Sequence, residues 1–169
     1  TVDNRNDPFD IFKEWMALAE TSEPNDPNAM CLSTVNADGC PSSRMVLLKD
    51  YDDRGFTFFT NSHSQKGQEL RQNPNVALLF HWKSLLRQIR IEGTVETISH
   101  DETTKYFHSR ARESQIASYA SLQSQPLDDK SIYEDKINTV RDQFEGEDNI
   151  PCPDHWNGYR VTPSKMEFW

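Results

Sequence analysis

The chain has 169 residues, a formal net charge of −9 and a pI near 5.0. Nucleic acid and anionic membrane surfaces repel such a molecule as a whole, so we exclude general binding to either. No apolar run approaches the roughly 20 residues of a membrane-spanning helix, and the three cysteines show no paired framework. We therefore expect a reduced, cytoplasmic protein.

The first predicted element is an amphipathic helix that begins at Pro8, with Asp7 as its N-cap. A loop over residues 21–28 follows it. We expect residues 1–28 to form this N-terminal helix and loop, and residues 29–169 to form the main domain.

Short β-rich runs follow at residues 29–35, 42–51 and 56–60, with the turn sequences NADG and DDRG between them. This pattern predicts an antiparallel meander. A short helix over residues 64–73, capped by Ser64, interrupts it before further strands at 76–82 and 87–98.

A capping-box pair, Ser99 and Glu102, predicts the start of a helix that contains Tyr106. Tyr106, Arg110 and Ser114 recur at intervals of four, a spacing that stacks side chains on one helix face. A phenol, a guanidinium and a hydroxyl form a donor-rich surface that suits a small dianion. The ordinary alternative is a helix with a polar face.

The C-terminal part predicts another helix capped by Asp128 and then a strand pair, or one bent strand, over residues 156–169. Five or six consecutive strands with helices at their ends favour an α+β domain built on a small barrel, and they argue against a parallel Rossmann sheet. No glycine-rich phosphate loop is present, so side chains must hold any phosphate.

Four segments supply polar groups with the chemistry of anion binding: the stripe just described, a loop with Gln123 and Ser124 that alone indicates only a polar loop, and two segments with basic residues. Arg44 and Lys49 are an odd number of residues apart, so in a regular strand they project to opposite faces and can serve two phosphates. Thr60 lies at a strand end and Lys66 near a helix start, where backbone N–H groups and the helix dipole favour an anion. For each residue the alternative is a solvated surface side chain.

Familiar catalytic templates are absent. There is no G-x-S-x-G or H-E-x-x-H sequence, and the C-x-x-H formed by Cys152 and His155 lacks the second pair of a zinc site. If the protein is an enzyme, a cofactor therefore supplies the chemistry. Trp82 and Trp169 either belong to the core or flank a planar ring.

Seven ordered motifs, SSRMVLLK, GFTFFTN, QKGQEL, RQIRIEG, YFHSRARESQI, QSQ and MEFW, resemble the pyridoxine (pyridoxamine) 5′-phosphate oxidase family from about Asp7 to Trp169. The resemblance implies an FMN-binding split β-barrel, antiparallel and Greek-key-like, that works as a homodimer with each flavin between subunits. It also implies oxidation of pyridoxine or pyridoxamine 5′-phosphate to pyridoxal 5′-phosphate, with O2 as acceptor and H2O2 released.

The resemblance assigns roles residue by residue. It implies flavin contacts at Arg44, Met45, Val46, Leu47, Phe59, Thr60, Gln65, Lys66, Gln88, Gln123, Ser124 and Trp169. It implies contacts to the substrate's phosphate at Lys49, Tyr106, Arg110 and Ser114. No metal is implied.

Two departures from the family pattern matter. Gln65 stands where the family usually has Arg, which removes a charged hydrogen bond worth roughly 1.5–3 kcal/mol and lowers FMN affinity about tenfold. The family also continues beyond Trp169 with an Arg-Leu-His-Asp-Arg segment that supplies an Arg and a His over the substrate ring, so the catalytic residues are unassigned. We expect the natural protein to be longer.

Two alternative functions stay open. One is a non-catalytic flavin- or pyridoxal-phosphate-binding barrel, and the other is a split-barrel protein with another reductant.

Overall fold

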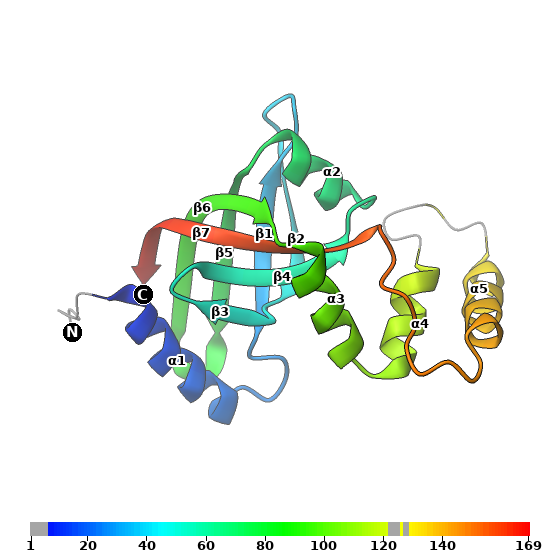
Figure 1. Cartoon of the computed structure of the whole chain (residues 1–169). Coiled ribbons are helices and arrows are strands. Elements are labelled where there is room, and N and C mark those ends of the chain that lie inside the picture. Colours follow the sequence, from blue (N-terminus) through cyan, green and yellow to red (C-terminus); the bar gives the residue numbers. More distant parts are fainter. Residues whose placement is uncertain (1–6, 122–125, 127–128) are drawn as a thin grey trace. The chain divides into compact units, whose positions relative to one another are not determined.

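The computed structural model describes residues 7–121, 126 and 129–169, which form two compact units. Unit 1 comprises the described residues up to Phe58, together with Glu69–Glu96 and Arg160–Trp169; unit 2 comprises Phe59–Gln68 and the described residues of Thr97–Tyr159. The elements, shown in Figure 1, are α1 (Pro8–Ser22), β1 (Ala29–Val35), β2 (Pro41–Leu47), β3 (Asp50–Asp52), β4 (Gly55–Asn61), α2 (Gln65–Gln72), β5 (Asn75–Trp82), η1 (Lys83–Leu85), β6 (Arg87–Thr97), α3 (His100–Ser109), α4 (Arg112–Ala120), α5 (Lys130–Gln143) and β7 (Trp156–Phe168).

The strands form one sheet in the order β2-β1-β5-β6-β7-β4-β3. Strand β1 pairs antiparallel with β2 and β5, β3 with β4, and β5 with β6. This confirms the expected α+β class with an antiparallel barrel-type sheet. None of the described helices combines the length and apolar character that crossing a bilayer requires.

The continuous meander predicted over residues 29–60 is wrong. Strands β1 and β2 form one hairpin and β3 and β4 another, but the two hairpins lie at opposite ends of the sheet order. The chain changes partners between Leu48 and Lys49. The Leu48 N–H donates to the Asn28 carbonyl, whereas the next N–H, of Lys49, donates to the carbonyl of Thr57, both at 2.9 Å. The turn signals therefore located the strands but not this change of partner.

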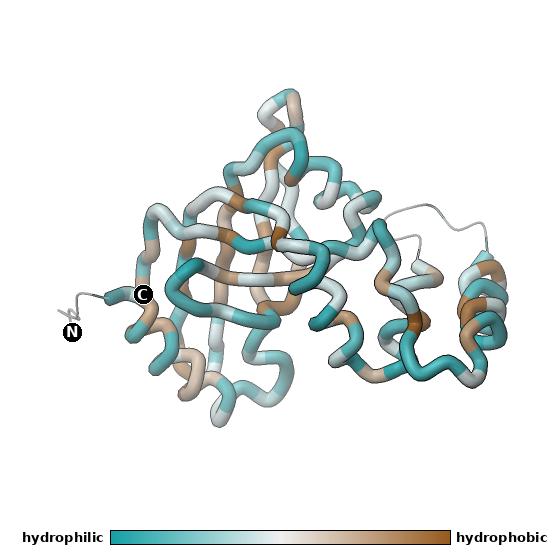
Figure 2. Tube along the Cα trace, viewed as in Figure 1, coloured by the Kyte–Doolittle hydropathy of each residue, from teal (hydrophilic) through white to brown (hydrophobic). Residues whose placement is uncertain are grey.

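The core of unit 1 lies between the sheet and α1. In β1 the buried positions alternate strictly, and Phe12 of α1 packs edge-on against Phe56 and Phe80 at 4.9 and 5.3 Å between ring centres. Trp82 is 2% exposed, and its indole N–H donates to the Pro27 carbonyl at 2.7 Å. The possibility that Trp82 flanks a bound ring is therefore wrong, because this side chain belongs to the core. Figure 2 shows hydrophobic residues along the strands and a hydrophilic β3–β4 loop.

Two glycines allow the neighbours of β7 to approach it closely. A Cβ on Gly55 would lie 2.0 Å from the Val161 carbonyl oxygen, and one on Gly93 would lie 2.2 Å from that of Thr162. Gly55 also has a φ of +139°, which side-chain-bearing residues rarely adopt. For the C-terminal segment we expected either a strand pair or one bent strand. It is one continuous strand, β7, of 13 residues.

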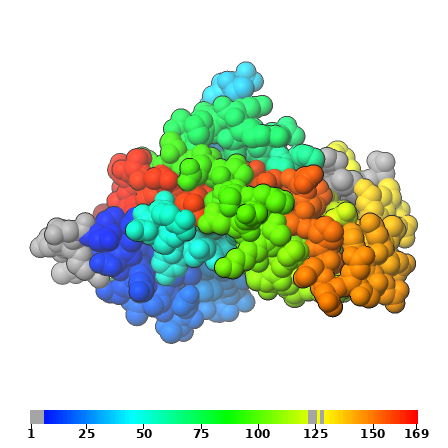
Figure 3. All heavy atoms as spheres, viewed as in Figure 1, coloured from blue at the N-terminus to red at the C-terminus, as the bar shows by residue number. Residues whose placement is uncertain are grey.

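Unit 2 contains α3, α4, α5 and the first residues of β7. Its hydrophobic cluster includes Phe107, Ile116, Val140 and Trp156. Helix α5 is capped by the side chain of Asp129, which accepts a hydrogen bond from the backbone N–H two residues on; the cap that we expected, Asp128, lies outside the described residues. Residues 145–149, after α5, are exposed and lie at the surface in Figure 3.

Candidate functional site

In unit 2 the predicted helical stripe of Tyr106, Arg110 and Ser114 is not continuous. Helix α3 ends at Ser109, Arg110 is its C-cap with φ −79° and ψ 155°, and α4 begins at Arg112. Tyr106 therefore lies on α3, Ser114 lies in the first turn of α4, and Arg110 lies at the corner between the helices. The single-helix prediction is wrong because the corner makes tertiary contacts that override the local helical spacing.

The Arg110 guanidinium has an aromatic ring on one face and a hydroxyl at one edge. Its Cζ lies 4.9 Å from the ring centre of Trp156, and its Nη1 donates to Ser118 Oγ at 2.7 Å. Burial lowers the pKa of Arg110, an effect that the neighbouring Tyr106 and Cys152 oppose. Within the described part of the chain, no carboxylate forms an ion pair with Arg110. This side chain is thus a half-buried cation whose charge no described carboxylate balances.

Three parallel aromatic rings adjoin this corner. The Phe59 ring stacks on Tyr106 at 4.2 Å with an interplanar angle of 11°, and on Trp156 at 4.9 Å and 10°. Burial raises the pKa of Tyr106, so its phenol stays a neutral hydrogen-bond donor over a wider pH range. Phe59, which the resemblance assigns to the flavin, thus has its ring packed within unit 2.

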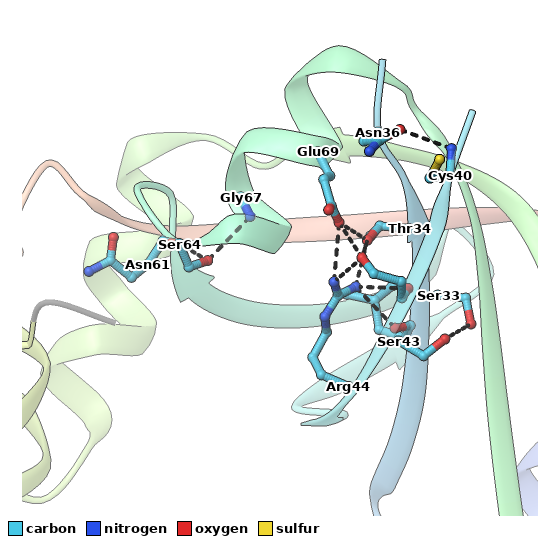
Figure 4. Close-up of polar contacts among 12 residues, drawn as sticks. Ser33, Thr34, Asn36, Cys40, Ser43, Arg44, Asn61, Ser64, Gly67 and Glu69 are labelled. Atoms are coloured by element: carbon cyan, nitrogen blue, oxygen red, sulfur yellow. Dashed lines mark hydrogen bonds and ion pairs between the residues drawn. The ribbon is translucent and has the colours of Figure 1, made fainter. Parts of the chain in front are cut away.

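The other predicted anion-binding residues of unit 2 lie around a tight turn. Thr60 and Lys66 are both buried, at 4% and 7% exposure. Ser64 caps α2 as expected, because its hydroxyl accepts from the Gly67 N–H at 3.2 Å and donates to the Asn61 carbonyl at 2.7 Å (Figure 4). A buried lysine beside a capped helix start is a setting that suits an anion. Gln65, by contrast, is exposed.

In unit 1, Arg44 is the centre of a partly buried polar network (Figure 4). Its Nη1 donates to Thr34 Oγ1 at 2.5 Å, and its Nη2 donates to Ser42 Oγ at 2.6 Å and to Glu69 Oε2 at 3.1 Å. Because arginine has no acceptor, the hydroxyl hydrogens of Thr34 and Ser42 are left to donate to Glu69 Oε2, with which both hydroxyls are in contact. Hydrogen bonds thus link four side chains, and the Arg44 side chain remains 21% exposed.

Sequence reasoning found Arg44 but missed the three residues that surround it. One signal was readable: Thr34 continues the inward alternation of Met30 and Leu32, so a hydroxyl occupies a core position of β1. Glu69 gave no such signal, because its helix is polar in sequence. In unit 2, sequence reasoning missed Ser118 and Trp156, because their contacts with Arg110 depend on tertiary packing.

Two predicted flavin contacts, Met45 and Leu47, share one exposed face of the unit 1 sheet. Met45 and Leu47 of β2 are 63% and 39% exposed, whereas Arg44 and Val46 alternate with them and are less exposed. Across β1, Cys31 is the cross-strand partner of both Met45 and Leu79, so these three residues form a row.

Gln88 lies beside this face. It lines a hollow of about 230 Å³ together with Ser33, Leu79 and Arg90. The backbones of Gln88 and Trp169 exchange two hydrogen bonds, at 2.8 and 2.9 Å, and the Trp169 side chain is 79% exposed. Two residues that the resemblance assigns to the flavin are therefore direct neighbours.

Lys49 lies apart from that face. The prediction that Arg44 and Lys49 project to opposite faces of one regular strand is wrong, because β2 ends at Leu47 and Lys49 lies beyond it. Lys49 is exposed and lines a hollow of about 310 Å³ together with Glu20 and Tyr51. Burial, reinforced by Glu20 and Asp50, raises the pKa of Tyr51. This hollow therefore presents a cation and a phenol beside two carboxylates.

Gln123 and Ser124, the remaining predicted flavin contacts, lie outside the described residues. Among the residues that are described, no group of three or more His, Cys, Asp or Glu side chains is arranged to hold a metal ion. Cys31, Cys40 and Cys152 are free thiols.

Comparison with solved structures identifies the fold. The fold is similar to PhzG from Burkholderia lata 383 in complex with tetrahydrophenazine-1-carboxylic acid, with a TM-score of 0.92 and 32% identity over 99% of this chain and 81% of that one. It is also similar to a pyridoxamine 5′-phosphate oxidase-related, FMN-binding protein from Nostoc punctiforme PCC 73102, with a TM-score of 0.76, 13% identity and coverage of 97% and 85%. The fold is thus that of the FMN-binding split-barrel proteins.

The sequence comparisons are more specific. The family model described as pyridoxamine 5′-phosphate oxidase matches residues 18–144. Pyridoxine/pyridoxamine 5′-phosphate oxidase of Caulobacter vibrioides (strain NA1000 / CB15N) is 57% identical over 98% of this chain and 74% of its own length. The protein of that name from Gluconobacter oxydans (strain 621H) is 54% identical over 99% and 84%. The chain belongs to the pyridoxamine 5′-phosphate oxidase family.

Proposed function

We propose that this protein oxidises pyridoxine 5′-phosphate or pyridoxamine 5′-phosphate to pyridoxal 5′-phosphate, with FMN as cofactor and O2 as electron acceptor. More than half of the aligned residues are identical to those of relatives named pyridoxine/pyridoxamine 5′-phosphate oxidase, which supports the substrate class. The observation that carries the proposal is Arg110, a half-buried cation without a carboxylate partner in the described chain, next to the Tyr106 phenol. A phosphate dianion would supply the missing charge and accept from both groups.

The residues present fit a phosphorylated flavin. Lys66 is a buried cation at a helix start, and Arg44 is a second cation whose side chain is 21% exposed. Gln88 offers an amide beside a hollow, and the exposed Trp169 ring offers an aromatic surface. We propose Arg44, Gln88 and Trp169 in unit 1, and separately Lys66 in unit 2, as contacts of the cofactor. Bound FMN would accept two electrons from the substrate carbon and pass them to oxygen.

The proposed contribution of the chain is to bind and orient the substrate. In unit 2, Arg110, Tyr106 and Ser114 hold the phosphate, which fixes one end of the substrate and raises the fraction of bound molecules in a reactive geometry. For Lys49 of unit 1 we keep the phosphate contact that the resemblance implies. Pyridoxine 5′-phosphate and O2 yield pyridoxal 5′-phosphate and H2O2. Pyridoxamine 5′-phosphate also consumes a water molecule and releases ammonia.

The proposal includes a homodimer. Met45, Leu47 and Leu79 are large apolar side chains at 36% exposure or more on unit 1, and two of them share a cross-strand row. A second copy of the chain that covers this face would remove the apolar surface from water. It would also enclose the flavin contacts proposed at Met45 and Gln88.

The test is a flavin titration followed by a turnover assay. We expect FMN to co-elute with the protein after desalting, and pyridoxine 5′-phosphate to release peroxide and pyridoxal 5′-phosphate in equal amounts. Unphosphorylated pyridoxine is the matched control and should react far more slowly. Bound flavin without any product would favour the alternative of a non-catalytic binding protein, and absence of bound flavin would contradict the cofactor assignment.

A further inference from the structure

The corner that carries Arg110 is held at its backbone by a buried amide. Gln115, at 7% exposure, donates from Nε2 to the Arg110 carbonyl at 2.8 Å, while its own N–H donates to the Ala111 carbonyl at 3.1 Å. Leaving a buried amide unpaired costs free energy, so these bonds favour the observed conformation of the corner. Gln115 thereby helps to hold the Arg110 backbone in place.

The aromatic partner of the Arg110 side chain is fixed as well. Trp156 is 7% exposed, lies parallel to the Phe59 ring at 4.9 Å, and meets the Phe107 ring at 5.2 Å with an angle of 66°. Tryptophan offers the most favourable ring face for a cation. These contacts hold the Trp156 ring in place, and the Arg110 guanidinium packs on the face of that ring.

The remaining N–H groups of Arg110 are left for a ligand. Arginine has five N–H donors, and within the described chain Arg110 makes one side-chain hydrogen bond, from Nη1 to the hydroxyl of Ser118 at 2.7 Å. Another arginine of unit 2 differs in this respect, because Arg141 forms an ion pair with Glu113 at 2.9 Å. Arg110 is held on one face and at one edge by neutral groups, which orient its charge without neutralising it.

We infer that Trp156 and Ser118 are positioning residues for Arg110, which they hold so that Nε and Nη2 present a two-pronged site to the phosphate of a B6 vitamer. This inference rests on the proposed function, because it takes Arg110 as a ligand of the substrate's phosphate. Neither residue needs to touch the substrate. They act by lowering the conformational freedom that Arg110 loses on binding.

The experiment compares two affinities in each variant, that for pyridoxal 5′-phosphate and that for pyridoxal, which lacks the phosphate. Ser118→Ala should lower the phosphate-dependent ratio of affinities by about threefold to tenfold, and Ser118→Thr, which keeps the hydroxyl, should retain it. Trp156→Leu should lower the ratio by a similar factor, whereas Trp156→Phe should retain most of it. Pyridoxal affinity should stay unchanged in all four.

The matched control is Ser109→Ala, which removes an exposed hydroxyl that donates to the Tyr106 carbonyl at 2.6 Å. It should leave the ratio unchanged. The unfolding midpoint of each variant shows whether the aromatic cluster has survived; if Trp156→Leu fails to fold, the Ser118→Ala and Ser118→Thr pair decides.

Two outcomes would overturn the inference, and they are distinguishable. If Arg110→Ala lowers the ratio but Ser118→Ala and Trp156→Leu do not, Arg110 binds phosphate without help from these residues. If Arg110→Ala itself leaves the ratio unchanged, the assignment of Arg110 to the substrate's phosphate is wrong, and the proposed function loses its main support.

Discussion

Arg44 and Glu69 form an ion pair in unit 1, with Nη2 and Oε2 3.1 Å apart and with side-chain exposures of 21% and 7%. The pair joins β2 directly to α2, and the hydroxyls of Thr34 on β1 and Ser42 on β2 contact both partners. Figure 4 shows Thr34 beside Arg44 and Glu69. A cation assigned to the flavin is therefore also part of the internal structure. Arg110 in unit 2 is the opposite case, because no described carboxylate pairs with it.

Glu69→Ala should destabilise the protein by about 3 kcal/mol, because removing one partner of a buried pair leaves the other charge uncompensated. Denaturant unfolding measures the change. The matched control is Glu92→Ala, which breaks an exposed pair with Arg90 at 3.6 Å and should cost less than about 1 kcal/mol. Equal losses in the two variants would show that the Arg44 network contributes no more than a surface ion pair.

Arg110→Ala should weaken binding of pyridoxal 5′-phosphate by about 2–4 kcal/mol while changing FMN affinity little, because we assign this guanidinium to the substrate's phosphate alone. Arg44→Ala should weaken FMN binding more than it weakens binding of pyridoxal 5′-phosphate. Calorimetric titration of each variant with both ligands measures this. Equal losses of the two affinities in Arg110→Ala would contradict the division of the two arginines between two phosphates.

Gln65→Arg should raise FMN affinity about tenfold, since it restores a charged hydrogen-bond donor beside Lys66. Affinity for riboflavin, which has no phosphate, should not change. Gln68→Arg, at another exposed position of the same helix, adds the same charge and serves as the control. If the two substitutions raise FMN affinity equally, the gain comes from general electrostatics and not from position 65.

Met45→Asp should convert a dimer into a monomer, because it places a charge on the apolar sheet face that we propose a second copy covers. Light scattering at micromolar concentration gives the mass. Leu86→Asp is the control, since Leu86 is 89% exposed and lies on the turn between the fifth and sixth strands. A wild-type protein that is monomeric throughout would contradict the dimer directly.

Much of the fold was predictable because local signals decide it. Apolar alternation located the strands, and Asp7, Ser64 and Ser99 marked the helix starts through hydrogen bonds that span only two or three residues. The change of partner between Leu48 and Lys49 was not predictable, since it depends on bonds to Asn28 and Thr57.

The candidate site, like the fold, was predictable from the sequence only in part. Residue types alone identified Arg44, Lys66 and Arg110 as anion-binding candidates. The spacing of Tyr106, Arg110 and Ser114 suggested one helix, but the bond from Gln115 to the Arg110 carbonyl and the ring of Trp156 hold a corner there instead. Contacts between residues distant in sequence have no periodic signature, so the partners of both arginines became visible only in the folded chain.

An anaerobic single-turnover reaction tests the central claim most directly. The FMN-loaded protein is mixed with pyridoxine 5′-phosphate without oxygen, and the visible flavin absorbance is followed together with pyridoxal 5′-phosphate. We expect the flavin to bleach with one product formed per flavin, and to regain its absorbance when oxygen is admitted. Flavin that stays oxidised while pyridoxine 5′-phosphate is demonstrably bound would contradict the claim that this protein is an oxidase of B6 phosphates.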